Sequence, residues 1–457
     1  MIRKILIANR GEIAVRIIRA CRNMGIQSVA IYSREDEKSL HVQLADQRIC
    51  IGEGAARNSY LNMDRIITAA LNVEADAIHP GFGFLSENST FVRKCQENHL
   101  IFIGPEADVI DRMGNKSAAR RTMMDVGVPV VPGSREPVYD AKTARKIAEE
   151  IGYPVMIKAS SGGGGKGMRV AESEEDLEAQ FCVAQMESAN AFGDDTMYLE
   201  RFVVNPRHVE IQIIADTHGN VVSLGERDCS VQRNHQKLVE ESPSPVVDAA
   251  MREKMNEYAI LAAKTVGYTN AGTIEFIVSP RGEFFFMEMN TRIQVEHGVT
   301  ELVTGTDLII EQIRVADGKE LSFSQEEVRP RGHAIECRIN AEIPERNFMP
   351  SPGLVQMIHL PAGNGVRVDT ALYSGYRIPS EYDSMIAKVL VHAPDREAAI
   401  RKMRTALDEM VILGVETNLD FQYQIMNHPV FCQGKADTGF IESFMKINTR
   451  PDVTSAE

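Results

Sequence analysis

The chain has 457 residues, 44% of them hydrophobic and 25% charged, which is typical of a globular protein of two to four domains. Its net charge of −14 argues against general binding to nucleic acid or to an anionic membrane, although a local basic cleft can still hold a nucleotide. No apolar run approaches the ~18 residues of a membrane span, and the N-terminus shows no secretory signal. The seven cysteines form no C-x-x-C pair, so we expect reduced thiols and a cytoplasmic location.

The first hundred residues combine short apolar runs with a helical apolar pattern. We expect strands at residues 5–8, 28–32, 77–78 and 101–103 and a helix over residues 13–24. This alternation predicts a parallel α/β sheet with right-handed crossovers. The turn NRGE at residues 9–12 stands where a dinucleotide fingerprint would lie but holds one glycine, so a nicotinamide-binding domain is disfavoured.

The glycine-rich stretch KASSGGGGKGM, residues 158–168, is flanked by regular structure. Before it, apolar residues recur at helical spacing over 144–151, and residues 155–157 form an apolar run typical of a buried strand. After it, residues 168–170 look extended, and an acidic helix begins near Ser173. The stretch therefore predicts a hairpin tip rather than a flexible linker.

Two phosphate-binding motifs can be tested on this stretch. A Walker A loop needs a hydroxyl residue after its lysine, but Lys166 is followed by Gly167. Gly162, Gly164 and Gly167 satisfy G-x-G-x-x-G, yet a strand follows them where a helix should. We therefore expect a glycine-rich flap whose backbone N–H groups bind phosphate oxygens, with added charge from Lys158 and Lys166.

The segment GTIEFIVSPRGEFFFMEMN reads as a β-hairpin. A four-residue loop, Ser279–Gly282, would pair Val278 with Glu283 and place Glu275 and Glu288 on one face at a diagonal. Diagonal neighbours lie ~7–8 Å apart, close enough for two carboxylates to share a cation such as Mg²⁺. A solvent-facing strand with incidental acids explains this pair equally well.

The residues after the hairpin favour a functional surface. From Glu288 onward, polar side chains recur at every second position, at Asn290, Arg292, Gln294 and Glu296. A strand would present all of them on one face. A row of carboxylate, amide and guanidinium groups beside a predicted metal site indicates a functional site.

Several long motifs, in order along the chain, resemble the biotin carboxylases of the ATP-grasp superfamily. The four that carry most of the resemblance are KASSGGGGKGM (158–168), RHVEIQ (207–212), ERDCSVQRNHQKLVEE (226–241) and EMNTRIQVEHGVTE (288–301). IANRGEIAVRI, HPGFGFLSEN, AIECRINAE and YDSMIAK extend it over nearly the whole chain. No single motif decides the matter, whereas the ordered set is specific.

The resemblance implies an α/β protein of three domains. These are an N-terminal Rossmann-like domain over 1–113, an ATP-grasp domain over 114–330 with a glycine-rich lid at about 131–203, and a C-terminal α+β domain over 331–447. It also implies a ligase reaction. ATP and bicarbonate would give carboxyphosphate, whose breakdown supplies CO₂ to N1′ of biotin borne on a carrier protein.

The resemblance also assigns roles to residues of this chain. The residues implied to bind ATP are Lys116, Lys158, Gly162, Gly163, Gly164, Gly165, Gly167, Met168, Glu200, Arg201, Val203, His208, Gln232 and His235. Those implied to bind Mg²⁺, or alternatively Mn²⁺, are Glu275, Glu288 and Asn290. Those implied to surround bicarbonate or biotin are Lys237, Arg292, Gln294, Val295 and Arg338.

The catalytic residues that the resemblance implies are Glu296, Arg338, Lys237 and Arg292. Glu296 is the implied general base for bicarbonate, and Arg338 the implied stabiliser of the biotin anion. Simpler structural interpretations stand beside these roles. Arg338 can form an ordinary ion pair with Glu336 on its own strand, and Cys229 can be a buried thiol. No ligand quartet supports zinc at the histidines.

The expected partners are a biotin carboxyl carrier protein, carboxyltransferase subunits and a second copy of the chain in a homodimer, with biotin attached to the carrier and not to this chain. We expect the holoenzyme to be acetyl-CoA carboxylase, in fatty acid biosynthesis. The alternatives are a two-subunit pyruvate or other acyl-CoA carboxylase, another ATP-grasp ligase, or a non-enzymatic nucleotide-binding subunit. Intact Lys237, Glu296 and Arg338 speak against the last of these.

The chain departs from the family pattern at three positions. Gly298 stands where proline is usual, which removes a backbone restraint after Glu296. Asn115 replaces a common aspartate, and Arg201 replaces a frequent lysine. None of the groups assigned to chemistry is missing.

Overall fold

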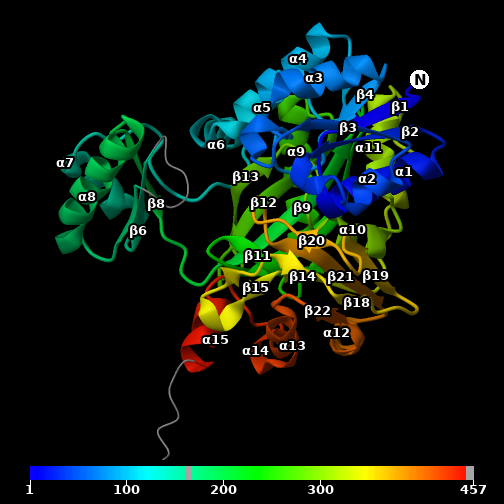
Figure 1. Cartoon of the computed structure of the whole chain (residues 1–457). Coiled ribbons are helices and arrows are strands. Elements are labelled where there is room, and N and C mark those ends of the chain that lie inside the picture. Colours follow the sequence, from blue (N-terminus) through cyan, green and yellow to red (C-terminus); the bar gives the residue numbers. More distant parts are fainter. Residues whose placement is uncertain (160–166, 449–457) are drawn as a thin grey trace, which may run out of the picture. The chain divides into compact units, whose positions relative to one another are not determined.

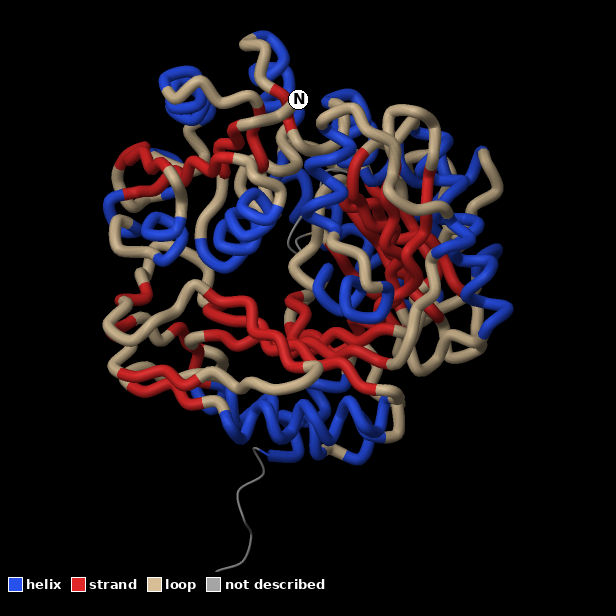
Figure 2. Tube along the Cα trace, turned by 90° about the vertical axis from the view of Figure 1, so that its right-hand side faces the viewer, coloured by secondary structure: helices blue, strands red, loops and turns tan. Residues whose placement is uncertain are grey.

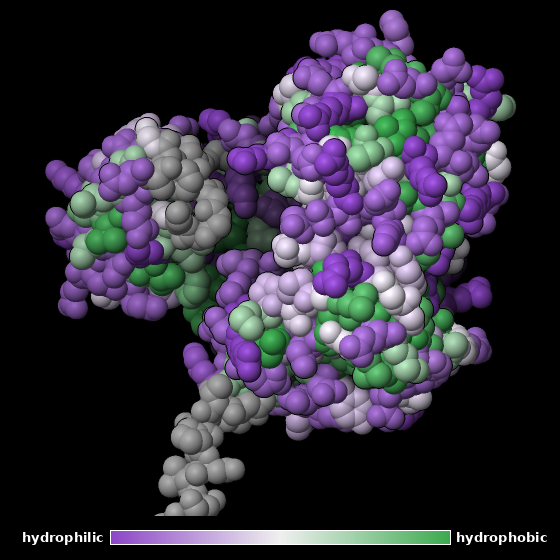
Figure 3. Space-filling view, in the orientation of Figure 1, coloured by the Kyte–Doolittle hydropathy of each residue, from purple (hydrophilic) through white to green (hydrophobic). Residues whose placement is uncertain are grey.

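The computed structural model describes residues 1–159 and 167–448 and divides into two compact units. The first unit comprises Met1–Gly114, Arg207–Glu275 and the chain from Met289, and the second comprises Asn115–Pro206 and Phe276–Glu288. Within the described ranges, no helix is both long and apolar enough to cross a membrane. The surface in Figure 3 is mainly hydrophilic, with hydrophobic residues in small groups between polar ones.

The N-terminal segment of the first unit forms the predicted parallel α/β sheet (Figure 1). Its strand order is β3-β2-β1-β4-β5, and neighbouring strands pair in parallel. The strands are β1 (Lys4–Ile7), β2 (Gln27–Ser33), β3 (Gln47–Gly52), β4 (Ala77–His79) and β5 (Ile101–Phe102). The helices are α1 (Gly11–Asn23), α2 (Leu40–Leu44), α3 (Met63–Asn72), α4 (Ser89–Glu97) and α5 (Ala107–Gly114). Strand β3 was not predicted, because it is largely exposed and carries no apolar run.

The largest sheet of the chain has the order β13-β12-β9-β10-β11-β14-β21-β19. Its strands are β9 (Arg207–Ala215), β10 (Val221–Arg233), β11 (Gln236–Ser242), β12 (Asn270–Val278), β13 (Phe284–Asn290), β14 (His333–Asn340), β19 (Val366–Thr370) and β21 (Met385–Ala393). Three two-stranded ladders accompany it: β15 (Glu342–Ile343) with β16 (Met349–Pro350), β17 (Gly353–Leu354) with β20 (Arg377–Ile378), and β18 (Met357–His359) with β22 (Val411–Leu413).

The two faces of β14 and β21 have different neighbours. Cys337, Val389 and Val391 belong to the apolar core on one face, and α12 and α13 pack against it as a helical layer (Figure 2). Because side chains alternate along a strand, Arg338 and Lys388 point to the other face. The helices of this part are α9 (Ala249–Val266), α10 (His297–Thr304), α11 (Leu308–Ala316), α12 (Arg396–Glu409), α13 (Leu419–Asn427), α14 (Pro429–Cys432) and α15 (Phe440–Asn448).

The second unit consists of helices and a small antiparallel sheet of order β7-β6-β8 (Figure 1). Its elements are α6 (Lys116–Asp125), α7 (Ala141–Ile151), β6 (Val155–Ala159), β7 (Met168–Ala171), α8 (Glu174–Phe192) and β8 (Met197–Arg201). Asn115 caps α6, since its side chain accepts a hydrogen bond from the N–H of Ala118 at 2.9 Å. Asparagine therefore caps the N-terminus of this helix as an aspartate would.

The predicted hairpin around the glycine-rich stretch is confirmed. Strands β6 and β7 pair antiparallel, with Lys158 opposite Met168. The predicted Gly162, Gly163, Gly164, Gly165 and Lys166 lie outside the described residues. Gly167 is described and has a φ of +71°, and a Cβ there would lie 2.8 Å from the Cβ of Ala159. Only glycine fits this position without strain.

Candidate active site

Lys237 lies at the centre of a buried acidic cluster in the first unit. Strands β10 and β11 join through Asn234 and His235, both with positive φ, and this tight turn places Lys237 opposite Gln232. The cluster has three carboxylates around one ammonium: Lys237 Nζ donates to Glu210 Oε2 at 2.6 Å, to Glu275 Oε1 at 3.1 Å and to Glu296 Oε1 at 2.6 Å. Burial alone would lower the pKa of Lys237, but the surrounding acids raise it well above its usual value.

Glu296 lies between two cations. One oxygen accepts from Lys237, and the other accepts from Arg338 Nη2 at 2.8 Å. Burial would raise the pKa of Glu296, but Lys237 and Arg338 hold it well below its usual value. The carboxylate is therefore held in its ionised form, and it is almost fully buried between the two cations.

Arg338, on β14, does not pair with Glu336. Its Nε donates to Glu240 Oε1 at 2.6 Å, and its Nη2 contacts both Glu240 and Glu296. The simpler interpretation of an ion pair with Glu336 is therefore wrong. The reason is that β11 supplies Glu240 from the neighbouring strand, and the segment before α10 supplies Glu296.

The row of alternating polar residues is not one strand. Strand β13 ends at Asn290, and the N–H of Thr291 donates to Glu87 Oε1 at 3.1 Å instead of to a neighbouring strand. Arg292 Nε donates to the other oxygen of Glu87 at 2.7 Å. Gln294 Nε2 still reaches the cluster, where it donates to Glu275 Oε1 at 3.1 Å.

The hairpin loop is one residue shorter than predicted. The N–H of Ser279 donates to the carbonyl of Glu283 at 2.7 Å, and the N–H of Gly282 donates to the carbonyl of Ser279 at 2.9 Å. Gly282 has a φ of +80°, as a three-residue hairpin loop with a glycine bulge requires. Glu283 therefore pairs with Ser279 and not with Val278. This shifts the register of the hairpin by one residue, so the turn does not place Glu275 and Glu288 on one face as predicted.

Glu275 is nevertheless an ionised carboxylate of the cluster, with hydrogen-bond donors around it. Asn290 Nδ2 donates to its Oε1 at 2.9 Å, and His208 Nε2 lies 3.1 Å from its Oε2. Burial would raise the pKa of Glu275, but Lys237 and His208 lower it well below its usual value. Lys237 Nζ and Gln294 Nε2 also donate to Glu275 Oε1, each at 3.1 Å, and Arg292 Nη2 donates to Asn290 Oδ1 at 3.1 Å. An ionised carboxylate is a ligand of the kind that Mg²⁺ prefers. The third predicted ligand, Glu288, belongs to the second unit, where its Oε2 lies 2.8 Å from Lys116 Nζ.

The other residues that are predicted to bind ATP, where the structure describes them, belong to both units. In the second unit Lys158 pairs with Glu200 across β6 and β8, and Arg201 Nη2 lies 3.4 Å from Glu283 and packs over the ring of Phe285. Val203 follows β8, and Met168 begins β7. In the first unit His208, Gln232 and His235 lie on β9, β10 and the β10–β11 turn.

Five residues of the site were not predicted: Glu87, Glu210, Arg227, Glu240 and Lys388. Arg227 is completely buried and donates to Glu210, Gln212, Thr273 and Thr300. Alternation along RHVEIQ places Glu210 beside the predicted His208, so the period-two rule could have found it. No local sequence pattern singles out the other four residues. Cys229 is a buried thiol whose pKa is raised by burial and by Glu210, which agrees with the simpler interpretation.

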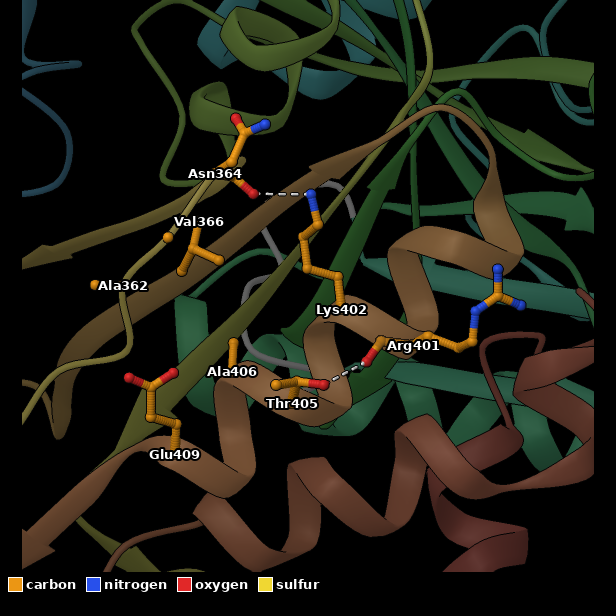
Figure 4. A pocket seen from close by; sticks show the side chains of 9 residues that line it. Ala362, Asn364, Val366, Arg401, Lys402, Thr405, Ala406 and Glu409 are labelled. Carbon is orange, nitrogen blue, oxygen red and sulfur yellow. Dashed lines mark hydrogen bonds between the residues drawn. The ribbon is translucent and has the colours of Figure 1, made fainter.

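A separate hollow of about 350 Å³ lies between the segment 362–366 and α12 (Figure 4). Its lining residues are Ala362, Gly363, Asn364, Val366, Arg401, Lys402, Thr405, Ala406 and Glu409. Lys402 Nζ donates to the carbonyl of Asn364 at 2.9 Å, and Arg401 pairs with Glu397. It holds none of the predicted site residues, and both cations are already engaged.

The chain is similar to known proteins over nearly its whole length. Three family models match in order: "Biotin carboxylase, N-terminal domain" over residues 1–110, "Carbamoyl-phosphate synthase L chain, ATP binding domain" over 115–324, and "Biotin carboxylase C-terminal domain" over 336–443. Biotin carboxylase 1 of Bacillus subtilis is 56% identical and covers 97% of this chain and 99% of its own. A pyruvate carboxylase subunit of Methanothermobacter thermautotrophicus is 50% identical and covers 98% of this chain and 91% of its own.

Two solved structures are similar over almost the whole chain. A biotin carboxylase–ATP complex from Campylobacter jejuni has a TM-score of 0.92 and 49% identity, and the match covers 97% of this chain and 99% of that one. The biotin carboxylase domain of a thermophilic 2-oxoglutarate carboxylase bound to bicarbonate has a TM-score of 0.94 and 46% identity, over 99% of this chain and 100% of that one.

Proposed function

Because the chain belongs to the biotin carboxylase family and is an ATP-grasp ligase, we propose that it carboxylates N1′ of biotin on a separate carrier protein, using ATP and bicarbonate. The observation that carries the proposal is the position of Glu296 between Lys237 and Arg338. A buried carboxylate held by two cations suits a site that binds a small anion and removes its proton.

In the first step, Glu296 takes the proton of bicarbonate, and a bicarbonate oxygen attacks the γ-phosphorus of ATP while ADP leaves. Lys237 and Arg292 balance the charge of the substrates. The low pKa of Glu296 in the free site does not oppose this role. A bound anion shares Lys237 and Arg338 with Glu296, so each cation lowers its pKa less and its basicity rises.

In the second step, carboxyphosphate breaks down to CO₂ and phosphate, and N1′ of biotin loses its proton to phosphate and attacks CO₂. Negative charge then develops on the ureido oxygen of biotin. Arg338 is the proposed stabiliser of that charge, and Glu240 holds its guanidinium in place from the next strand.

Glu275, Glu288 and Asn290 would hold Mg²⁺, or Mn²⁺, which would neutralise phosphate oxygens of ATP. Support comes from the ionised state of Glu275 and from the Hydrogenobacter thermophilus homologue, whose structure contains MgADP and bicarbonate. Lys116, Lys158, Glu200, Arg201, Val203, His208, Gln232, His235 and the glycine flap remain our proposal for ATP binding.

We further propose that the chain is the biotin carboxylase subunit of acetyl-CoA carboxylase, works in the cytoplasm as a homodimer, and meets carrier and carboxyltransferase subunits. The 2-oxoglutarate carboxylase homologue is described as a dimer, and all seven cysteines are free. Relatives named pyruvate carboxylase make that holoenzyme the alternative. The three domains, 1–113, 114–330 and 331–447, remain our proposal, and the family models over 1–110, 115–324 and 336–443 support it.

The experiment is ATP hydrolysis by the purified chain with and without bicarbonate and free biotin. We expect bicarbonate-dependent release of phosphate and biotin-dependent fixation of labelled bicarbonate. A rate of ATP hydrolysis that is the same with and without bicarbonate would contradict the proposal. Supplying purified carriers and acceptors of each holoenzyme then separates acetyl-CoA carboxylase from pyruvate carboxylase.

A further inference from the structure

Lys388, in the middle of β21, is a completely buried lysine outside the residues assigned to the reaction. Its Nζ donates to the carbonyl of Val295 at 2.6 Å. Glu12 Oε1 lies 3.4 Å and Asp369 Oδ2 3.8 Å from the same nitrogen. A buried ammonium is costly unless it is paired, and these acids supply the charge balance. The hydrogen bond of Lys388 nevertheless goes to the backbone carbonyl of Val295 in the candidate site.

The sheet places Lys388 beside Arg338, the proposed stabiliser of the biotin anion. In the β14–β21 register Lys388 is directly opposite Arg338, and in the β19–β21 register it is opposite Asp369. Residues opposite each other in an antiparallel pair point to the same face. Two cations from adjacent strands therefore hold two consecutive residues: Lys388 holds the carbonyl of Val295, and Arg338 holds the carboxylate of Glu296.

The segment 291–296 has no strand partner, so side chains from elsewhere position it. Glu87 accepts from the N–H of Thr291 at 3.1 Å, and Gln294 donates to Glu275 at 3.1 Å. Lys388 supplies the contact at the end of the segment. A peptide unit is planar, so a fixed Val295 carbonyl also fixes the direction of the N–H of Glu296 and the position of its Cα.

We infer that Lys388 is a positioning residue for bicarbonate, which acts by holding the Val295–Glu296 peptide in the orientation that the substrate requires. The inference rests on the proposed function and deepens it. Lys388 touches neither substrate nor the reacting atoms. Its loss should therefore affect the use of bicarbonate and leave ATP binding unchanged.

The test is steady-state kinetics of bicarbonate-dependent ATP hydrolysis by Lys388→Met, which keeps the length of the side chain but removes its donor and charge. Hydrogen bonds to charged groups typically contribute enough for a change of about 10- to 100-fold, so we expect the KM for bicarbonate to rise by that factor. The KM for ATP should stay within about twofold. Val389→Ala is the matched control, because Val389 is the next residue of β21 and faces the apolar core. It should lower the melting temperature without raising the KM for bicarbonate.

Lys388→Met leaves Glu12 without its cation, so a second variant combines it with Glu12→Gln. This pair removes one positive and one negative charge and should fold with the same bicarbonate defect. Glu12→Gln alone keeps the bond to Val295 and should keep the normal KM.

An unchanged KM for bicarbonate in either lysine variant would overturn the inference. So would equal changes in both KM values, or failure of both lysine variants to fold, since the lysine would then serve only the fold. Wild-type protein without bicarbonate-dependent hydrolysis would instead overturn the proposed function, so the two failures are distinguishable.

Discussion

Glu296 and Arg338 form a partly buried ion pair, with Arg338 Nη2 2.8 Å from Glu296 Oε2, although they come from different elements of the fold. The pair joins the proposed base of the first half-reaction to the proposed charge stabiliser of the second. Substitution of each partner therefore predicts a different kinetic result.

In Glu296→Gln the side chain keeps its size but can no longer accept the proton of bicarbonate. General-base removal typically costs ~10²–10⁴-fold, and we expect that loss in bicarbonate-dependent ATP hydrolysis and in carboxybiotin formation alike. The measurement is both rates on one preparation. Wild-type rates in a folded variant would exclude Glu296 as the base.

Arg338→Ala should slow carboxybiotin formation by ~10²–10³-fold, because it removes one preorganised charge stabiliser from the biotin step. Bicarbonate-dependent ATP hydrolysis without biotin should fall far less. Because Glu240 and Glu296 would both lose a partner, the melting temperature should be recorded as well. Equal loss in both rates with a lower melting temperature would assign Arg338 to the fold alone.

Glu275→Gln and Glu288→Gln should each raise the Mg²⁺ concentration needed for half-maximal rate, since a neutral amide is a poorer magnesium ligand than a carboxylate. Titration of Mg²⁺ at fixed ATP measures this. Glu283→Gln, on the same hairpin but outside the predicted ligand set, is the control. Unchanged metal dependence in both test variants would show that these glutamates do not hold the metal.

Gly298→Ala should destabilise the fold by about 1–2 kcal/mol. An added Cβ would lie 2.4 Å from Leu390 Cδ2 in a packed core, which typically costs about 1–3 kcal/mol, whereas replacing a glycine inside helix α10 returns roughly 0.5–1 kcal/mol. The chain thus fills with Leu390 the space that a larger residue at 298 would need. Chemical denaturation measures the loss. Leu390→Ala should relieve the contact, so the double variant should be more stable than the sum of the single losses allows. Strict additivity would contradict this explanation.

The stability of the protein should fall as the pH falls below about 6.5, in part through His297. Burial, and then the nearby Lys388, lower the pKa of His297 from 6.5 to about 3. Between these values the unfolded chain binds a proton that the folded chain does not, so each pH unit costs up to about 1.4 kcal/mol. Denaturation of wild type and His297→Gln at pH 6.5 and 4.5 measures this. The variant should lose less stability between the two values, and an equal loss would refute the contribution of His297.

Local patterns alone predicted the N-terminal parallel sheet and the β6–β7 hairpin, because apolar periodicity and turn residues act over a few neighbouring positions. The ordered motifs indicated the family and named Lys237, Glu296 and Arg338, which the structure brings together. What the sequence could not predict depends on partners far along the chain. Thr291 leaves the expected strand because its N–H bonds to Glu87, 204 residues away.

The hairpin turn shows the same limit at short range, since one residue of loop length decides which side chains share a face. The partner of Arg338 was decided by the sheet order, which brings Glu240 beside it and leaves the carboxylate of Glu336 with no hydrogen bond among the described residues. Lys388 was not predicted because a lysine in a buried strand has no local signature. Its place beside Val295 exists only once β21 lies next to β14, and that pairing joins segments that are far apart along the chain.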